Sequence, residues 1–269
     1  MKKKPITANL KLLRIGGDAK TTKGQRTQGV LTGILYLAPA TQASKVDVCP
    51  FASDGCRLAC LYTAGHGKFS NVQNARIKKT LNYLKDRQAF VDTLKKDVEK
   101  LVKVAKKHKM QPAVRLNGTS DLPWEKVFPV GDFPQVKFYD YTKNPVRMKK
   151  FTQGKMPANY HLTFSRSETN EKQALAILPT GGNVAAVFAT KKGQDLPKTW
   201  KGFEIIDGDL DDVRFTDPTG VVVGLRAKGD ALKDKTGFVI HDDLGLVENA
   251  VECAMDAREI LAKVEGGGA

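Results

Sequence analysis

The sequence predicts an α/β fold, and within that class a TIM-like (β/α) barrel that is irregular or incomplete. Two observations lead to this prediction. Short runs of apolar and β-branched residues recur along the chain, and helical patterns lie between some of them. Several of the runs are continuously apolar, as expected for parallel strands that are buried on both faces. An open α/β sheet is the alternative architecture.

The domain organisation follows from composition. No low-complexity linker and no strong change of composition divides the chain. We therefore predict one barrel domain over residues 29–265. Residues 1–28 are polar and basic and show no clear period, so they are predicted to form an irregular N-terminal arm.

The apolar runs predict eight strands, and the 3.6-residue pattern predicts the helices. The strands are predicted at residues 30–37, 113–116, 136–141, 160–165, 184–189, 203–206, 221–225 and 238–241. The clearest helical pattern covers residues 74–107 with a break near Lys85-Asp86, and further helices are predicted at 170–178 and 246–264. Residues 207–220 leave no room for a full crossover helix. The barrel is therefore incomplete there, or those two strands are joined in an unusual way.

The charge of the chain bears on its partners. The net charge is +15 at pH 7, which favours polyanionic partners such as nucleic acid. Much of the excess lies between Lys78 and Lys109, on a predicted helix. The alternative interpretation is a lysine-rich helix face that is simply solvated.

Several classes of protein are disfavoured. No stretch reaches the roughly 18 apolar residues that a membrane span needs. The basic N-terminus is not followed by an apolar run, so we expect no export and a cytoplasmic location. The sequence has no Walker loop, no nucleophile elbow and no paired-histidine zinc motif. Hydrolase and kinase functions therefore have no motif to support them.

Three of the four cysteines, Cys49, Cys56 and Cys60, lie in one short segment with the spacing C-x₆-C-x₃-C. A secreted disulfide scaffold would distribute its cysteines in pairs along the chain. Thiolates are natural ligands of iron–sulfur clusters and of zinc. The segment follows the first predicted strand, at the end where barrel enzymes hold their chemistry. The sequence therefore predicts a metal centre on these three thiols, with a [4Fe–4S] cluster favoured over zinc.

The fourth ligand of this centre stays open. A [4Fe–4S] cluster can use three cysteines and leave one iron for a small molecule or a fourth residue. His66, in the same segment, is one candidate, and it would equally complete a Cys₃His zinc site. Cys253 is the other candidate, although it lies in an apolar helical pattern where a packed thiol is the simpler interpretation. Three buried cysteines that act only as small apolar side chains are the weaker alternative for the cluster segment.

Two strings of residues resemble a known family. They are Cys-Pro-x₅-Cys-x₃-Cys-Leu-Tyr-x-Ala-Gly-x-Gly, which begins at Cys49, and Arg-Leu-Asn-Gly-Thr-Ser-Asp at 115–121. Both look like the bacteriophage "gene product eighty-eight" family, and the likeness covers most of residues 30–245. A cysteine loop after the first barrel strand also resembles the radical S-adenosylmethionine (SAM) enzymes, which carry C-x₃-C-x₂-C there, a different spacing. The resemblance implies a phage origin, in the infected host cell, and a radical-SAM-like barrel, but it names no reaction.

The resemblance also suggests where SAM would bind. In radical SAM enzymes a Gly-Gly-Glu-like turn after the second strand binds the amino group of SAM. The matching place in this sequence holds Asn117, Gly118 and Asp121. Asp121 could form a salt link to an ammonium group, so SAM is the second cofactor that the resemblance suggests.

Polar residues follow several other predicted strands, and a barrel would place them at the same mouth as the cysteines. Turns favour Asp, Ser, Thr and Gly on conformational grounds alone, so each of these residues is equally a turn residue. A serine here suits a ribose or a carboxylate, and an arginine suits an anionic group. The candidate cofactor or substrate ligands are Ser165, Arg166, Glu168, Asp207, Arg226 and His241.

Two functions from different classes fit these features. The first is a phage iron–sulfur protein with a radical-SAM-like barrel, engaged in redox or SAM-dependent radical chemistry and supplied by an external electron donor. The second is a zinc-bearing nucleic-acid-binding protein, in which a Cys₃His site supports a basic surface that engages phosphates. The sequence identifies no catalytic residue, so enzyme status stays undecided. Metal and sulfide analysis separates the two functions.

Overall fold

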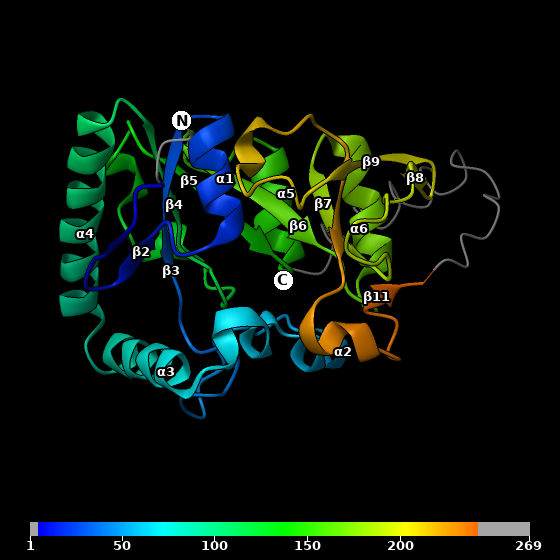
Figure 1. Cartoon of the computed structure of the whole chain (residues 1–269), viewed down its shortest axis with the longest axis horizontal. Helices are drawn as coiled ribbons and strands as arrows, with labels where there is room; N and C mark the ends of the chain where they lie inside the picture. Colours follow the sequence, from blue (N-terminus) through cyan, green and yellow to red (C-terminus); the bar gives the residue numbers. More distant parts are fainter. Residues whose placement is uncertain (1–4, 242–269) are drawn as a thin grey trace, which may run out of the picture.

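The computed structural model describes residues 5–241. Its centre is a mixed α/β sheet of eleven strands, most of them parallel (Figure 1). The order across the sheet is β1-β2-β3-β4-β5-β6-β7-β10-β9-β8, and β11 pairs with β7. The strands are β1 (Ala8–Asn9), β2 (Leu13–Ile15), β3 (Val30–Leu35), β4 (Gln111–Arg115), β5 (Lys137–Thr142), β6 (Tyr160–Ser165), β7 (Asn183–Phe188), β8 (Thr199–Trp200), β9 (Phe203–Asp207), β10 (Val222–Arg226) and β11 (Val239–Ile240).

The core of the sheet is parallel from β3 through β7 and on to β10 and β9, whereas β1, β2 and β8 add antiparallel pairs at its ends. Parallel neighbours need crossover connections, and helices supply most of them. The α-helices are α1 (Ala19–Thr27), α2 (Asp54–Leu58), α3 (Ser70–Lys85), α4 (Arg87–Lys107), α5 (Pro145–Thr152) and α6 (Glu171–Ile177). The 3₁₀ helices are η1 (Leu61–Thr63), η2 (Gly65–Lys68), η3 (Trp124–Lys126), η4 (Val130–Asp132), η5 (Leu178–Thr180), η6 (Arg214–Thr216) and η7 (Gly229–Lys233).

The two faces of the sheet are covered differently. The helix α4 packs on β3 and β4, α5 packs on β5 and β6, and α6 packs on β6 and β7. Side chains alternate between faces along a strand, so Leu31 joins this larger core whereas Val30 does not. Val30 packs instead with Tyr139 of β5 and with Val213, which belongs to the connection between β9 and β10. The helices α4, α5 and α6 thus cover one face, whereas α1 packs on β3 beside Val213 and helps to cover the other.

The cysteine segment lies at the C-terminal end of the parallel strands. It leaves β3, forms α2, η1 and η2, and returns through α3 to α4. In Figure 1 this part of the chain, with α2 and α3, lies along one end of the sheet rather than on a face. Two backbone hydrogen bonds tie it to the loop after β4: the Gly118 N–H donates to Leu35 O, and the Asp121 N–H donates to Val48 O, both at 2.9 Å.

The local predictions are confirmed. A strand is found at each of the eight predicted places, within one or two residues at most of the ends. The long helical pattern is divided where the sequence predicted it, because α3 ends at Lys85 and α4 begins at Arg87. Asp86 caps α4, since its carboxylate accepts a hydrogen bond from the Ala89 N–H at 2.9 Å. The predicted helix at 246–264 lies outside the described residues, and so does Cys253.

The N-terminal residues depart from the predicted irregular arm. Residues 8–27 contain β1, β2 and α1. Leu13 and Ile15 are fully buried against the rest of the core, and β2 pairs with β3. The apolar run in this stretch is too short to show a periodic pattern in the sequence. The three-residue strand β2 is nevertheless long enough to bury both side chains.

The strand order departs from that of a regular eightfold barrel, in which each strand pairs with the next. The connection between β9 and β10 contains only η6, and the two strands are parallel neighbours. As a result β10 lies between β7 and β9. The α/β class with a large, mostly parallel sheet is confirmed, and the joint after β9 is the unusual connection that residues 207–220 predicted. Across residues 5–241 no helix is both long and apolar enough to span a membrane.

Candidate metal centre

The three clustered cysteines line one cavity at the C-terminal end of the sheet. The cavity has a volume of about 800 Å³, and Cys49, Cys56, Cys60 and His66 all contribute to its wall. This volume is within the range of small-molecule and cofactor sites, about 300–1,000 Å³. All three thiols are free and half-buried. The spacing in the sequence therefore does bring the thiols to one place.

The short helix α2 sets the position of Cys56. Ser53 is its N-cap, and its hydroxyl accepts a hydrogen bond from the Cys56 N–H at 3.2 Å. The carboxylate of Glu168, which follows β6, accepts from the Ser53 hydroxyl and from the Gly55 N–H, both at 2.8 Å. Glycine at position 55 leaves room for this contact, because an added Cβ would overlap the Thr236 hydroxyl and lie 2.7 Å from a Glu168 carboxylate oxygen. The cysteine helix is thus fastened to the end of β6.

Backbone groups position Cys49. Its sulfur accepts a hydrogen bond from the Ala40 N–H at 3.3 Å and donates to the Thr119 carbonyl at 3.6 Å. Its own N–H donates to the Asp47 carboxylate at 2.7 Å. Asp47 also forms an ion pair with Arg57 of α2, at 2.7 Å. Hydrogen bonds and an ion pair therefore fix the loop around Cys49.

Burial governs the protonation of the thiols. It raises the pKa of Cys49 from 9.0 to about 12, and the neighbouring thiols of Cys60 and Cys56 raise it further. Burial also raises the pKa of Cys60, whereas the positive charges of Lys143 and Arg76 act to lower that pKa. Cys49 and Cys60 therefore favour the protonated thiol, and metal binding would have to release their protons.

Two kinds of metal centre use thiolate donors of this type. Among residues 5–241, no group of three or more His, Cys, Asp or Glu side chains forms a site for a metal ion. A single tetrahedral zinc needs all its sulfurs about 2.3 Å from one point. A [4Fe–4S] cluster places each thiolate on a different iron, so its sulfurs surround a larger body. Three thiols on the wall of one cavity are the type of donor that both kinds of centre use.

Most of the other predicted ligands reach the same cavity, and some do not. The cavity wall includes Asn117, Gly118, Asp121, Ser165 and Arg226. Arg166, Glu168, Asp207 and His241 are not part of it.

The side chains of the 115–121 string are occupied by protein contacts. The Asn117 side chain donates to Leu122 O and to Asp140, and its oxygen accepts from the Ser120 hydroxyl, the Leu122 N–H and the Trp124 indole. Asp121 accepts from Thr142, from the Lys143 N–H and from Arg147. The Gly118 N–H is bonded to Leu35. These residues shape the wall, but they offer few unused donors or acceptors.

The remaining predicted ligands have structural contacts of their own. Arg166 pairs with Glu171 at 2.6 Å and donates to the carbonyl of Phe238 at 3.0 Å. Asp207 pairs with Arg226 at 2.9 Å. His241 is exposed.

Ser165 accepts a hydrogen bond from the Lys143 ammonium at 2.8 Å. Ser165 and Lys143 both line the cavity, so this contact lies at the wall.

The strand-end pattern predicted part of the remaining charged and aromatic wall, namely Arg115, Tyr141, Lys143, Asp209 and Asp212. Other members of the wall were not singled out, because they come from segments far apart in the chain and no local motif marks them. They are Arg14, Asp18, Lys20, Tyr36, Arg76 and Lys228.

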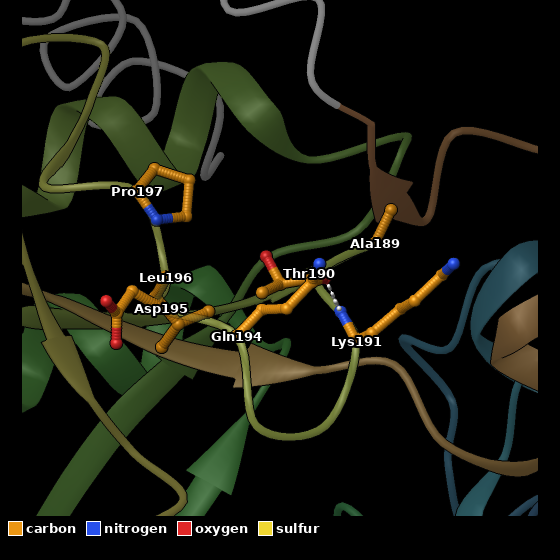
Figure 2. A pocket seen from close by; sticks show the side chains of 7 residues that line it. All are labelled: Ala189, Thr190, Lys191, Gln194, Asp195, Leu196 and Pro197. Atoms are coloured by element: carbon orange, nitrogen blue, oxygen red, sulfur yellow. Dashed lines mark hydrogen bonds between the residues drawn. The ribbon is translucent and has the colours of Figure 1, made fainter.

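A second hollow, of about 520 Å³, lies at the loop after β7 (Figure 2). Its lining consists of Ala189, Thr190, Lys191, Gln194, Asp195, Leu196 and Pro197. The Lys191 N–H donates to the Gln194 side chain at 3.2 Å, which closes the loop on itself. This lining belongs to one loop and contains no cysteine or histidine, so we assign no site to it.

A family model described as "Gene product 88" matches residues 10–242. The matched span includes the cysteine segment and the string at 115–121. No curated protein and no solved structure matches the chain.

Proposed function

The chain belongs to the gene product 88 family, as its two motif strings indicated, and on that premise we propose that it is an iron–sulfur protein. Cys49, Cys56 and Cys60 would hold a [4Fe–4S] cluster. One observation carries the proposal: three free thiols from one loop line a single cavity at the end of a parallel sheet. Such a cluster supplies one-electron chemistry when it is bound.

The chain's own residues support a metal centre on these thiols. His66 lines the cavity with the three thiols, so the Cys₃His zinc site stays the alternative that metal analysis must test. Lys143 and Arg76 place positive charge near Cys60, and positive charge stabilises thiolates and an anionic cluster. Glu168 holds the N-terminus of α2, so Cys56 is fixed before any metal arrives.

We further propose that the sheet is an incomplete (β/α) barrel of radical-SAM-like plan. Supporting this are the run of parallel strands from β3 to β9, the helices packed on one face, and the cysteine loop directly after β3. SAM binding is the finer part of the proposal. The occupied side chains of Asn117 and Asp121 leave its amino group without the expected partner, so SAM needs a test of its own.

Metal and sulfide analysis of the full chain, purified without oxygen, tests the cluster. We expect iron and acid-labile sulfide in equal amounts, close to four of each per chain, with brown visible absorption. A colourless protein with one zinc per chain would overturn the proposal and favour the nucleic-acid-binding alternative, which also requires binding that weakens steeply with salt.

Single substitutions assign the ligands. Cys49→Ser, Cys56→Ser and Cys60→Ser should each abolish most of the iron. Cys253→Ser and His66→Ala separate the fourth-ligand candidates, because only a true ligand alters the visible or electron paramagnetic spectrum. Iron retained in all three of the first variants would contradict the assignment.

The SAM-dependent form of the proposal is tested by adding SAM and a reductant to the loaded protein. Formation of 5′-deoxyadenosine would support it, and its absence with an intact, reducible cluster would restrict the function to redox chemistry with an external electron donor. The proposed setting is the cytoplasm of the infected host cell.

A further inference from the structure

Two arginines of the cavity wall, Arg14 and Arg76, have no acidic partner. Arg14 lies on β2 and Arg76 lies on α3, and both line the cavity. No hydrogen bond or ion pair of either side chain is found within residues 5–241. Arginines in buried or half-buried positions normally pair with a carboxylate or another anion, because desolvating an unpaired charge is costly.

Two aromatic rings hold the Arg76 guanidinium in place, but they leave N–H groups of it without hydrogen-bond acceptors. Its guanidinium lies 4.8 Å from the centre of the Tyr36 ring and 5.6 Å from the centre of the Tyr62 ring. The Nε and Nη1 atoms are buried and have no hydrogen-bond partner among the described residues. Ring faces attract the charge but do not accept the planar N–H groups as a carboxylate does. The two tyrosines therefore orient a guanidinium whose donors remain free.

Gly17 gives the Arg14 side chain room to pass close to the backbone. A Cβ at Gly17 would overlap the Arg14 guanidinium. The backbone at Gly17 is not in the left-handed region, so the glycine serves the close passage of the side chain rather than a turn. Arg14 and Arg76 are near enough that the charge of Arg14 lowers the pKa of Arg76, after the larger effect of burial.

The acids of the wall are engaged elsewhere. Asp121 pairs with Arg147, Asp209 pairs with Lys20, and Asp212 pairs with Arg115.

Asp18 caps α1 by accepting from the Lys20 N–H at 2.8 Å, and it forms no ion pair with either arginine. Lys79, the other cation near the pair, donates to Leu12 O. The two like charges thus face one cavity with no counter-charge in contact.

We propose that Arg14 and Arg76 form a site for the anionic oxygen group, carboxylate or phosphate, of a small molecule that binds beside the cysteines. Paired guanidiniums offer such a group several N–H donors in one plane. The ligand then lies with its anionic end at β2 and α3 and its remainder toward Cys60 and the centre of the cavity. The two arginines thus indicate the class of ligand for the proposed function. Any reaction of that ligand rests on the proposed iron–sulfur cluster, whereas its binding to the arginines does not.

Isothermal titration calorimetry of the full chain with inorganic phosphate, with acetate and with SAM tests the site and separates phosphate from carboxylate. At least one probe should bind the wild type. Arg14→Gln and Arg76→Gln should each weaken that probe about tenfold or more, as expected for the loss of a charge-assisted hydrogen bond. Gly17→Ala should weaken it as well, although it keeps every charge.

Arg87→Gln is the matched control. Arg87 is an exposed arginine that also lies over a tyrosine, 5.3 Å from the centre of the Tyr83 ring, but it does not line the cavity. Its substitution should leave the affinity unchanged. Failure of all three probes to bind, or equal weakening by Arg87→Gln, would overturn the site. The iron content of each variant, measured in parallel, shows separately whether the cluster proposal holds.

Discussion

The carboxylate of Glu168 accepts a hydrogen bond from the backbone N–H of Gly55 at 2.8 Å, across 113 residues of sequence. The N–H groups at the start of a helix have no partner within the helix, so Glu168 satisfies one of them in α2. The same carboxylate accepts from the Ser53 hydroxyl. Glu168 was expected to bind a cofactor or substrate directly. Its contacts make it instead the residue that holds the cysteine helix.

Glu168→Ala should therefore reduce cluster binding without removing a ligand. The variant leaves the Gly55 N–H and the Ser53 hydroxyl without their partner, and α2 loses its attachment to β6. We expect several-fold less iron per chain after anaerobic reconstitution and a loss of about 1–3 kcal/mol in the free energy of unfolding.

Glu204→Ala is the control, because Glu204 is exposed on β9. Its iron content and stability should equal those of the wild type. Normal iron in Glu168→Ala would mean that other contacts suffice to position Cys56.

Asp212 is the centre of a buried polar cluster at the base of the cavity. Its carboxylate accepts from the Arg115 guanidinium and from the Tyr139 hydroxyl, both at 3.0 Å. Arg115 also lies over the Tyr141 ring at 4.6 Å. Asp212→Asn removes the negative charge and leaves Arg115 buried without a counter-charge. We expect a loss of about 3 kcal/mol or more, measured by urea unfolding.

Asp132→Asn provides the comparison for this variant. Asp132 is exposed in η4, so its substitution should change stability by less than about 0.5 kcal/mol. Equal stability of the two variants would show that Arg115 finds another partner, such as water in the cavity.

Local order was predictable from the sequence because it depends on local patterns. Continuous apolar runs located the parallel strands, since these are buried on both faces. The charge of Lys85-Asp86 interrupted the helical pattern, and Asp86 is the capping residue between α3 and α4. The spacing of Cys49, Cys56 and Cys60 predicted a shared site, and all three line one cavity.

The remaining features depend on contacts between distant segments. Packing across the sheet decides whether β10 or β9 lies next to β7. The sequence shows only that residues 207–220 are too short for a full crossover helix. Arg14 and Arg76 lie on β2 and α3, and nothing near either one in the sequence marks it as part of a site. The occupied state of Asn117 likewise depends on Asp140, which belongs to a different strand.

Asp86→Ala tests the helix boundary. The Asp86 carboxylate caps α4 through the Ala89 N–H, and the loss of such a cap costs about 1 kcal/mol. Asp92→Ala, further into α4, removes only an exposed hydrogen bond with Gln88. Such a contact contributes about 0.2–0.5 kcal/mol to stability. Urea unfolding of both variants should rank Asp86→Ala as the less stable. The opposite order would show that tertiary packing fixes the start of α4.

His161 is a half-buried histidine that makes the stability of the protein sensitive to acid. Burial lowers the pKa of His161 from 6.5 to about 4, and the positive charges of Arg214 and Lys137 lower it further. Its Nε2 is buried and has no hydrogen-bond partner within residues 5–241. Because the folded pKa lies below the unfolded one, the unfolded chain binds the proton more readily between these values. Stability is therefore lost as the pH falls through this window.

The loss from this one residue between pH 7 and pH 5 is about 2 kcal/mol. His161→Phe removes the titrating group and keeps an aromatic ring beside Phe151, whose ring centre lies 5.1 Å from that of His161. Buried acids such as Asp217, whose pKa burial raises to about 6, titrate in both proteins, so the difference between them isolates His161. That difference should grow as the pH falls, whereas His108→Gln, at an exposed position, should follow the wild type. A difference independent of pH would show that His161 is already protonated in the folded protein or equally titratable in both states.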